Sequence, residues 1–193
     1  MILSADEIGR SLAGSYRLMS RDATGMKAFE VSIAGFWRSF AAMLLTAPAF
    51  VIALAEDRLR AGLPLEAGLF ADGGIVATHI LALMGGWLVF PLAMIAIVRR
   101  LGLGHRYIGY IVAWNWSVVL ATMMLSVPQA LHVLGLATGS LAVVYATAFT
   151  VIVAHHRWFL AKAALGISGG LAGLLVVVDL GLSGVVGLSL SYL

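Results

Sequence analysis

The composition of this 193-residue chain excludes an ordinary water-soluble domain. Hydrophobic residues make up 62% of it and charged residues only 11%, and the mean hydropathy is +1.03, whereas soluble domains are about half apolar and a quarter charged. The chain has no cysteine, which excludes disulfides, thiolate-bound zinc and iron–sulfur clusters. The formal charge of +3 does not indicate nucleic-acid binding, because membrane orientation accounts for the basic residues and leaves no basic stripe. We therefore expect an integral membrane protein whose first partner is the lipid bilayer.

Residues 1–35 are polar enough to lie outside the hydrocarbon, and we expect a cytoplasmic segment that is retained because it lacks a signal-peptide pattern. Ser4 and Glu7 have the spacing of a capping box, which predicts the start of a helix. An apolar stripe at helical spacing then favours an amphipathic helix anchored at the membrane interface; it consists of Ile8, Leu12 and Tyr16. Docking of this helix onto a partner or onto the transmembrane bundle remains the alternative.

Residues 36–193 are predicted to form one transmembrane domain of five helices. Each span is an apolar stretch close to or above the length of about 20 residues that a helix needs to cross a bilayer. The predicted spans are residues 36–55, 74–98, 107–127, 133–154 and 164–190. The first is long enough only if Arg38 extends back to the interface, and Pro48 is expected to kink it. Pro128 marks either a turn or a kink, so the fourth span starts between residues 131 and 140.

Lysine and arginine are unevenly distributed between the two sides of this five-span arrangement. Only Arg58 and Arg60 fall on one side. The other side carries Arg10, Arg17, Arg21, Lys27, Arg38, Arg99, Arg100, Arg106, Arg157 and Lys162. Because positive residues are enriched in cytoplasmic loops, this asymmetry predicts a cytoplasmic N-terminus and a C-terminus on the far side. We expect a multi-pass protein of a bacterial cytoplasmic (inner) membrane.

Asp179 is the most informative polar residue of the spans. It follows three valines in the fifth span, and an unpaired carboxylate in the hydrocarbon costs at least about 2.5 kcal/mol. A partner at similar depth is therefore expected. The candidates for an intramembrane polar cluster with Asp179 are His79, His132 and Gln129. Such a cluster predicts a site for protons, ions or a small polar ligand, and the alternative is a hydrogen bond that fixes helix register.

Small and amide side chains predict where the spans pack together. The pairs Gly166/Gly170 and Gly169/Gly173 have the four-residue spacing that allows two helices to approach closely. We therefore predict a helix-packing surface on the fifth span. Asn115, in the third span, is expected to hydrogen-bond to another helix, with a ligand contact as the alternative.

Motifs of common membrane enzymes are absent from the sequence. There is no G-x-S-x-G, no H-E-x-x-H and no P-loop. His155 and His156 are adjacent, and adjacent residues on a helix point about 100° apart, so we expect no metal site there. A haem held by His79 and His132 lacks any companion motif. We expect no cofactor and no enzymatic activity.

Several of these features resemble the Yip family of five-span membrane proteins, which has many bacterial members. They are the five spans, the cytoplasmic N-terminal segment, a proline within the first span, and Gly109, Tyr110 and Pro128 in the third. The resemblance implies a five-helix bundle with the N-terminus inside and the C-terminus outside. The family's eukaryotic members are similar to trafficking scaffolds that contact small GTPases. No residue of this sequence indicates a small GTPase as its partner. The tryptophan-rich tetrapyrrole and cholesterol binders also have five spans, but they require paired prolines, and the four prolines here are all isolated.

Two functional hypotheses follow from the sequence. The first is a non-enzymatic accessory, scaffold or assembly subunit that binds another membrane protein, or itself, through the glycine-lined fifth span. The second is a small oligomeric transporter or channel that uses the polar cluster around Asp179, since five helices are few for a monomeric carrier.

Overall fold

The computed structural model describes residues 3–64, 66 and 68–190, and the regular elements of this part of the chain are all helices, with no strand. A short N-terminal region precedes the long helices. The elements are α1 (Ala5–Met19), the 3₁₀ segment η1 (Ala23–Ala28), α2 (Ile33–Phe40), η2 (Ala41–Thr46), α3 (Ala47–Arg60), α4 (Gly73–Arg100), η4 (Gly104–Arg106), α5 (Tyr107–Val133), α6 (Gly139–Leu165) and α7 (Gly169–Leu190).

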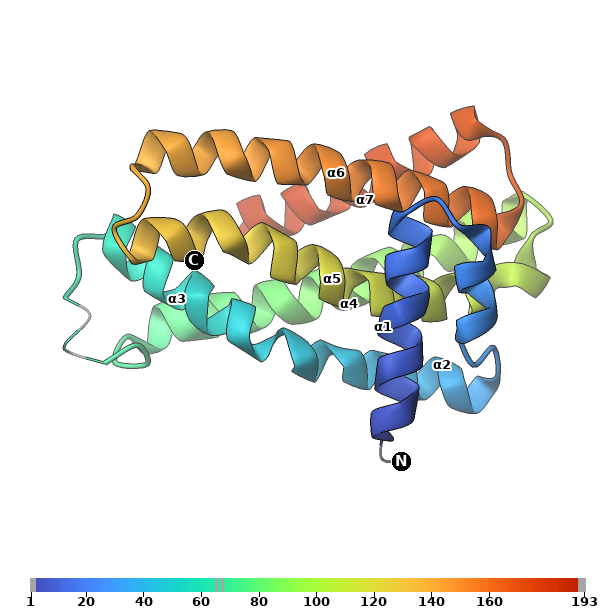
Figure 1. The fold of residues 1–193 in the computed structure, drawn as a ribbon, viewed down its shortest axis with the longest axis horizontal. Helices are drawn as coiled ribbons and strands as arrows, with labels where there is room; N and C mark the ends of the chain where they lie inside the picture. The colour runs from blue at the N-terminus through green and yellow to red at the C-terminus, as the bar shows by residue number, and fades with distance from the viewer. Residues whose placement is uncertain (1–2, 65, 67, 191–193) are drawn as a thin grey trace.

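Five helices in the described residues are long and apolar enough to cross a membrane, which confirms the predicted class of a multi-pass, all-α protein. The first is the continuous path of α2, η2 and α3, and the others are α4, α5, α6 and α7. They lie side by side and are joined at alternate ends (Figure 1). A helix such as α6 is about 40 Å long at 1.5 Å per residue, so it exceeds a hydrocarbon core of about 30 Å.

Helix α5 lies at the centre of the bundle. In its most apolar stretch 61% of the residues are buried, against 39% or less in the other four spans. It packs against α1, α2, α3, α4 and α6. Aromatic rings fill the space between α4 and α5: Trp114 stacks on Phe90 at 5.0 Å and meets Trp87 edge-on at 6.4 Å, measured between ring centroids.

Pro48 changes the helix type in the first span. Proline has no N–H to donate, and its ring clashes with the carbonyl four residues earlier. The chain therefore forms the tighter 3₁₀ segment η2 before it, and α3 then starts with Pro48 in its first turn, where a missing N–H costs nothing. Thr46 closes the junction by donating its hydroxyl to the Met43 carbonyl at 2.6 Å.

The third and fourth spans are longer than the sequence indicated. Helix α5 continues through Pro128 to Val133. Helix α6 begins after the N-cap Thr138 and ends at Gly166, which adopts the left-handed conformation with φ of 64°. The predicted fourth span ended at residue 154, so Arg157 lies within the helix, about 12 Å from its last residue.

Helix α1 crosses one end of the bundle (Figure 1). Its N-cap follows the prediction, because the Ser4 hydroxyl accepts a hydrogen bond from the Glu7 amide at 3.1 Å. The buried face of α1 contacts the bundle and consists of Glu7, Ser11, Gly14, Ser15 and Leu18. Ile8 and Leu12 lie half-buried beside this face, whereas Tyr16 is 64% exposed. Docking onto the bundle is thus present, and contact of the exposed side with lipid stays a prediction.

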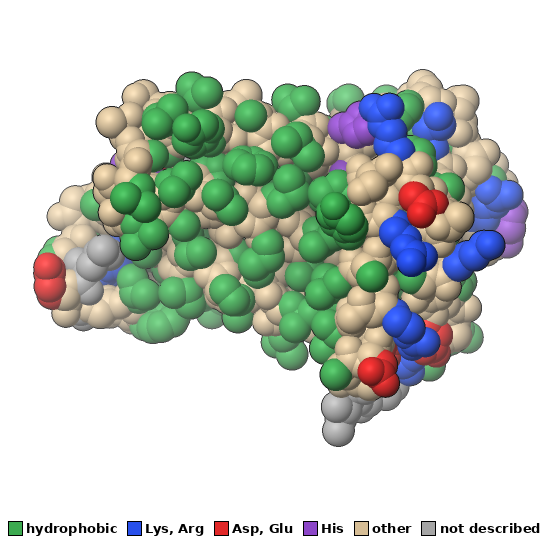
Figure 2. Space-filling model, viewed as in Figure 1, with side chains coloured by type: hydrophobic (Ala, Val, Ile, Leu, Met, Phe, Trp, Pro, Cys, Tyr) green, Lys and Arg blue, Asp and Glu red, His purple; other side chains and the backbone are tan. Residues whose placement is uncertain are grey.

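Lys and Arg side chains gather at the end of the molecule where α1 lies (Figure 2). We call this the basic end; it carries Arg10, Arg17, Arg21, Lys27, Arg99, Arg100 and Arg106. The opposite end, which we call the far end, includes Arg58 and Arg60 at the close of α3. Between the two ends, the face shown in Figure 2 is covered mainly by hydrophobic side chains.

Candidate functional site

Arg157 of α6 and Asp179 of α7 form an ion pair inside the bundle. The Arg157 Nη1 donates to Asp179 Oδ2, and the two side chains are 15% and 3% exposed. Asp179 lies about 15 Å along α7 from its first residue, a depth that matches Arg157 on α6. Both charges are therefore near the middle of the bundle, where each is costly without the other. The sequence pattern places Arg157 beyond the fourth span, with the basic residues of the cytoplasmic side, and so does not indicate it as a partner of Asp179.

Aromatic side chains surround this pair. The Arg157 guanidinium carbon lies 5.9 Å from the centroid of the Trp114 ring, which places the cation over an aromatic face. The phenol of the buried Tyr110 is also close enough to interact with both charges. Arg157 is thus held between a carboxylate and the aromatic core of α4 and α5.

Several buried polar atoms near the pair lack a standard hydrogen bond within the described residues. They are Asp179 Oδ1, Trp87 Nε1 and Trp114 Nε1. The Trp114 indole does interact with the Asp179 carboxylate, but outside the usual distances and angles. A buried polar group without a partner costs about 1–3 kcal/mol, and such groups in a native fold call for a functional or structural reason.

Two adjacent cavities lie along α4 and α5, one beside α3 and the other beside α6 and α7. The first, which we call the ion-pair chamber, has a volume of about 150 Å³ and is lined by Arg157, Trp87, Trp114, Thr122, Gly86 and Ser183 among others. The second, the far chamber, has a volume of about 270 Å³ and its polar lining is Thr46, His79, Thr122, Ser126 and Gln129. Ala82, Leu83 and Thr122 line both chambers, so the two are adjacent.

The position of α4 explains the chambers. A methyl group on Gly85 would come within 3.0 Å of Val186 Cγ1, so this glycine allows α4 to approach α7 closely. Gly86, the next residue, has open space instead and lines the ion-pair chamber. Toward the basic end the Tyr107 hydroxyl donates to the Pro91 carbonyl at 3.0 Å. Helix α4 is thus held to α7 and to the start of α5, and the α4 residues that line the chambers lie between residues 79 and 87.

The residues predicted to cluster with Asp179 occupy the far half of the molecule. His79 Nε2 lies 3.3 Å from Asp57 Oδ2, and His132 Nδ1 lies 2.8 Å from Glu56 Oε2. Gln129 lines the far chamber together with His79. Among the described residues, no hydrogen bond or ion pair joins Asp179 to His79, His132 or Gln129. His79 and Gln129 line the chamber next to the ion-pair chamber, whereas His132 lines neither chamber.

Asn115 and the predicted packing glycines have distinct environments. The Asn115 Nδ2 donates to Ser39 Oγ at 2.8 Å, a fully buried bond between α5 and α2. Gly166 is the left-handed C-cap of α6, and the Gly169 carbonyl accepts from Trp158 Nε1 at 2.8 Å. A methyl group on Gly170 or Gly173 would meet nothing within 4 Å.

Helix α7 turns one face toward the outside of the bundle. Asp179, Ala172 and Leu175 are buried on the opposite face. We call the exposed side the α7 outer face; it consists of Gly170, Gly173, Leu174, Val177, Gly181, Gly184 and Leu188. Leu174, Val177 and Leu188 are 57%, 66% and 64% exposed, and a methyl group on any of the four glycines would have open space.

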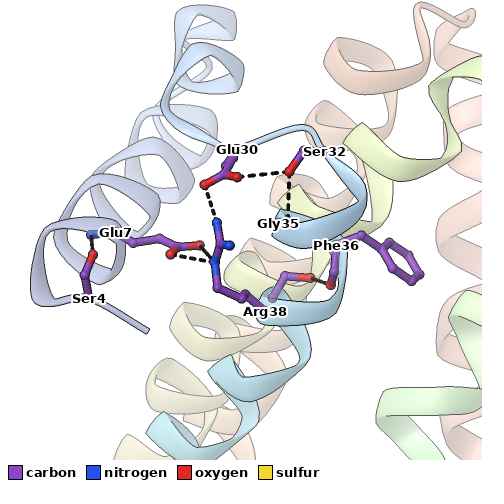
Figure 3. A network of polar contacts seen from close by, with 8 residues as sticks. Ser4, Glu7, Glu30, Ser32, Gly35, Phe36 and Arg38 are labelled. Atoms are coloured by element: carbon purple, nitrogen blue, oxygen red, sulfur yellow. Dashed lines mark hydrogen bonds and ion pairs between the residues drawn. The ribbon is translucent and has the colours of Figure 1, made fainter. Parts of the chain in front are cut away.

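A second arginine ties the N-terminal region to the first span (Figure 3). The Arg38 Nε donates to Glu7 Oε2 at 2.9 Å, and its Nη2 donates to Glu30. Ser32 completes the network by donating to Glu30 Oε1 and accepting from the Gly35 amide, each at 2.9 Å. The hydrogen bond from Arg38, and then that from Ser32, lowers the pKa of Glu30 below its usual value. This network links α1 to α2.

Comparisons of the chain with protein-family models, with curated proteins and with solved structures find no match. The resemblance to the Yip family therefore stays a prediction, since it rests on the number of spans and on a few residues such as Gly109 and Pro128. In the described residues, no three His, Asp or Glu side chains lie together in a way that could hold a metal ion. Function is therefore inferred from the α7 outer face and the two chambers.

Proposed function

We propose that this protein is a non-enzymatic membrane subunit that binds another membrane protein, or a second copy of itself, through the α7 outer face. The four open glycines of that face carry the proposal. A glycine in a helix interior is about 1 kcal/mol less favourable than alanine, and no contact within the described chain requires glycine at these positions. Close approach of a helix from another molecule would require it.

The surroundings of these glycines support the same proposal. Apolar surface alone does not drive helices together in lipid, because the lipid tails are equally apolar. Association depends instead on close packing, which a small-residue face with flanking larger side chains provides. Leu174, Val177 and Leu188 are such flanking side chains, and all three are exposed. In this proposal the basic end faces the cytoplasm of a bacterial inner membrane.

The test is the assembly state of variants in a mild detergent. Gly170→Leu and Gly181→Leu are expected to release the partner or to convert an oligomer to a monomer, because leucine blocks close helix approach. The matched control is Ala148→Leu, on the exposed side of α6, which should leave assembly unchanged. A wild-type protein that is a lone monomer in its native membrane would contradict the proposal.

The two chambers favour a second candidate, a small oligomeric transporter or channel. They are adjacent, and together they extend from the mainly apolar far chamber, which His79 and Gln129 line, to Arg157 of the Arg157–Asp179 pair. Ionisable residues inside spans commonly mark solute or proton pathways. For this candidate Asp179→Asn should abolish solute or proton flux in liposomes and retain assembly, whereas loss of assembly with no flux in the wild type would favour the first proposal.

A further inference from the structure

We propose that the ion-pair chamber binds a small carboxylate anion at Arg157, and that Asp179 takes up one proton in the same step. The site deepens the transport candidate and rests on it for its biological use, but binding itself requires neither flux nor a partner on α7. It is carried by the position of a guanidinium group at the wall of an intramembrane cavity.

The chamber offers hydrogen-bond donors to a ligand. A guanidinium group has five N–H donors, and the only hydrogen bond recorded for Arg157 in the described residues is that from Nη1 to Asp179. Arg157 lines the chamber together with the hydroxyl-bearing residues Ser183 and Thr122. A ligand that fits must supply acceptor oxygens, and a carboxylate matches the planar fork of arginine in a bidentate manner.

The size and walls of the chamber limit the rest of the ligand. Its volume of about 150 Å³ is close to that of an engineered protein cavity that holds benzene. Leu83, Val118 and Ala82 supply apolar wall. These features fit a carboxylate with a short apolar tail. The far chamber offers an approach from the other half of the bundle along Gln129, Ser126 and Thr122.

Charge balance requires the proton. The resting pair is neutral, and an added anion would leave one net negative charge in the middle of the bundle, which is costly. When the ligand displaces Asp179 from Arg157, a proton that binds the freed carboxylate keeps the site neutral. In this exchange Arg157⁺ leaves the Asp179 carboxylate for the ligand carboxylate. The O–H bond of Asp179 forms with a proton from a hydronium ion of the solvent, whose own O–H bond breaks to leave water.

Other titratable groups near the pair are few. Tyr110 of α5 interacts with both charges, and His156 of α6 interacts with Arg157. The part of α4 that lines the ion-pair chamber contributes no titratable side chain. Asp179 is the carboxylate in direct contact with Arg157, so it is the group that must accept the proton when that contact is exchanged.

Equilibrium binding of radiolabelled propionate to the full chain in nanodiscs tests this site, with gluconate as the larger control anion. Wild-type affinity should fall about tenfold for each pH unit between pH 6 and 8, because one proton binds with each anion. Asp179→Asn should still bind propionate, with less than a twofold change over the same range. Glu30→Gln, at the basic end, should behave as wild type.

Arg157→Gln alone leaves Asp179 without its partner and can fail to fold, so the double variant Arg157→Gln/Asp179→Asn provides the neutral control. It should fold and lose propionate binding by at least about 100-fold, the scale of a lost charged contact. The proposal is overturned by a wild type that binds no propionate, by a double variant that binds normally, or by a pH dependence that survives in Asp179→Asn. Equal competition by chloride or nitrate would overturn the assignment of a carboxylate. Binding without flux would reject transport and leave the site standing.

Discussion

Arg38 at the basic end and Arg157 in the middle of the bundle both bind carboxylates, in different surroundings. The two side chains are almost equally exposed, 17% and 15%. Arg38, however, shares its charge between Glu7 and Glu30, and Glu30 is 43% exposed. Arg157 has one carboxylate, 3% exposed, and an aromatic ring on its other side.

This comparison shows that the environment of the carboxylate, more than that of the arginine, sets the role of the pair. An exposed ion pair contributes little, since each charge is well solvated when the partner is removed. A buried pair contributes little net stability as a pair, but removal of one partner leaves an uncompensated charge. The Arg38 network therefore positions α1, whereas the Arg157 pair keeps two buried charges compensated and is a contact that a ligand can exchange.

The largest effect is expected for Arg157→Gln. Asp179 is left buried without its cation, which should lower the free energy of unfolding by about 3–5 kcal/mol. The double variant Arg157→Gln/Asp179→Asn should recover most of this loss, because no charge then remains unpaired. Denaturant unfolding in mixed micelles measures both. A double variant as unstable as the single one would show that shape, and not charge, holds α6 to α7.

Glu56 at the far end is an intermediate case. Its side chain is 2% exposed and accepts from Arg60 Nε at 2.6 Å and from His132 Nδ1 at 2.8 Å. Glu56→Gln should cost about 1.5–3 kcal/mol, the range for hydrogen bonds to charged groups. The neighbouring Asp57, 54% exposed, is the matched control, and Asp57→Asn should change the unfolding midpoint by less than Glu56→Gln does. Equal effects of the two variants would mean that burial of the carboxylate does not determine how much each pair contributes to stability.

Arg38→Gln should affect the position of α1 more than global stability. The chain has no native cysteine, so spin labels at Tyr16→Cys and Leu101→Cys, both exposed positions of the basic end, report the docking of α1 specifically. The distance distribution between the labels should broaden in Arg38→Gln, while the unfolding midpoint moves less than in Glu56→Gln. An unchanged distribution would mean that the buried face around Ser11 and Leu18 holds α1 without the network.

The local features of this fold could be predicted from the sequence. Five apolar stretches indicated five membrane-length helices, and Ser4 marked the start of α1, because span length and N-capping depend on neighbouring residues. The position of Arg157 could not be obtained in this way. The polar run at residues 155–157 indicates the end of a span, whereas α6 continues through the apolar residues 158–161 to Leu165. That apolar continuation was the signal available.

Spacing grouped four glycines on the fifth span, but Gly166 is the C-cap of α6, and Gly169, Gly170 and Gly173 belong to α7. Gly166 and Gly169 contact Arg106 and Trp158 within the chain, and Gly170 and Gly173 do not contact any neighbouring side chain. A four-residue repeat shows that glycines share a helix face. What that face contacts depends on tertiary packing, which the spacing of residues in one sequence does not show. The same limit applies to Asp179. The free-energy cost of an unpaired carboxylate in the membrane predicted a partner, but the identity of that partner depended on how far α6 extends beyond Arg157.

The smallest expected effect is the response of the basic end to acid. The pKa of Glu30 is lowered in the folded protein, chiefly by Arg38 and then by Ser32, from a usual value of 4.5. Its contribution to α1 docking is therefore complete above about pH 4.5 and is lost as the pH falls through the lower folded pKa. The Tyr16→Cys/Leu101→Cys label pair should show a modest broadening below that pH, and Glu30→Gln should show it already at neutral pH with less further change on acidification. An acid response that Glu30→Gln leaves intact would assign the effect to another carboxylate of the network, with Glu7 as the remaining contact of Arg38.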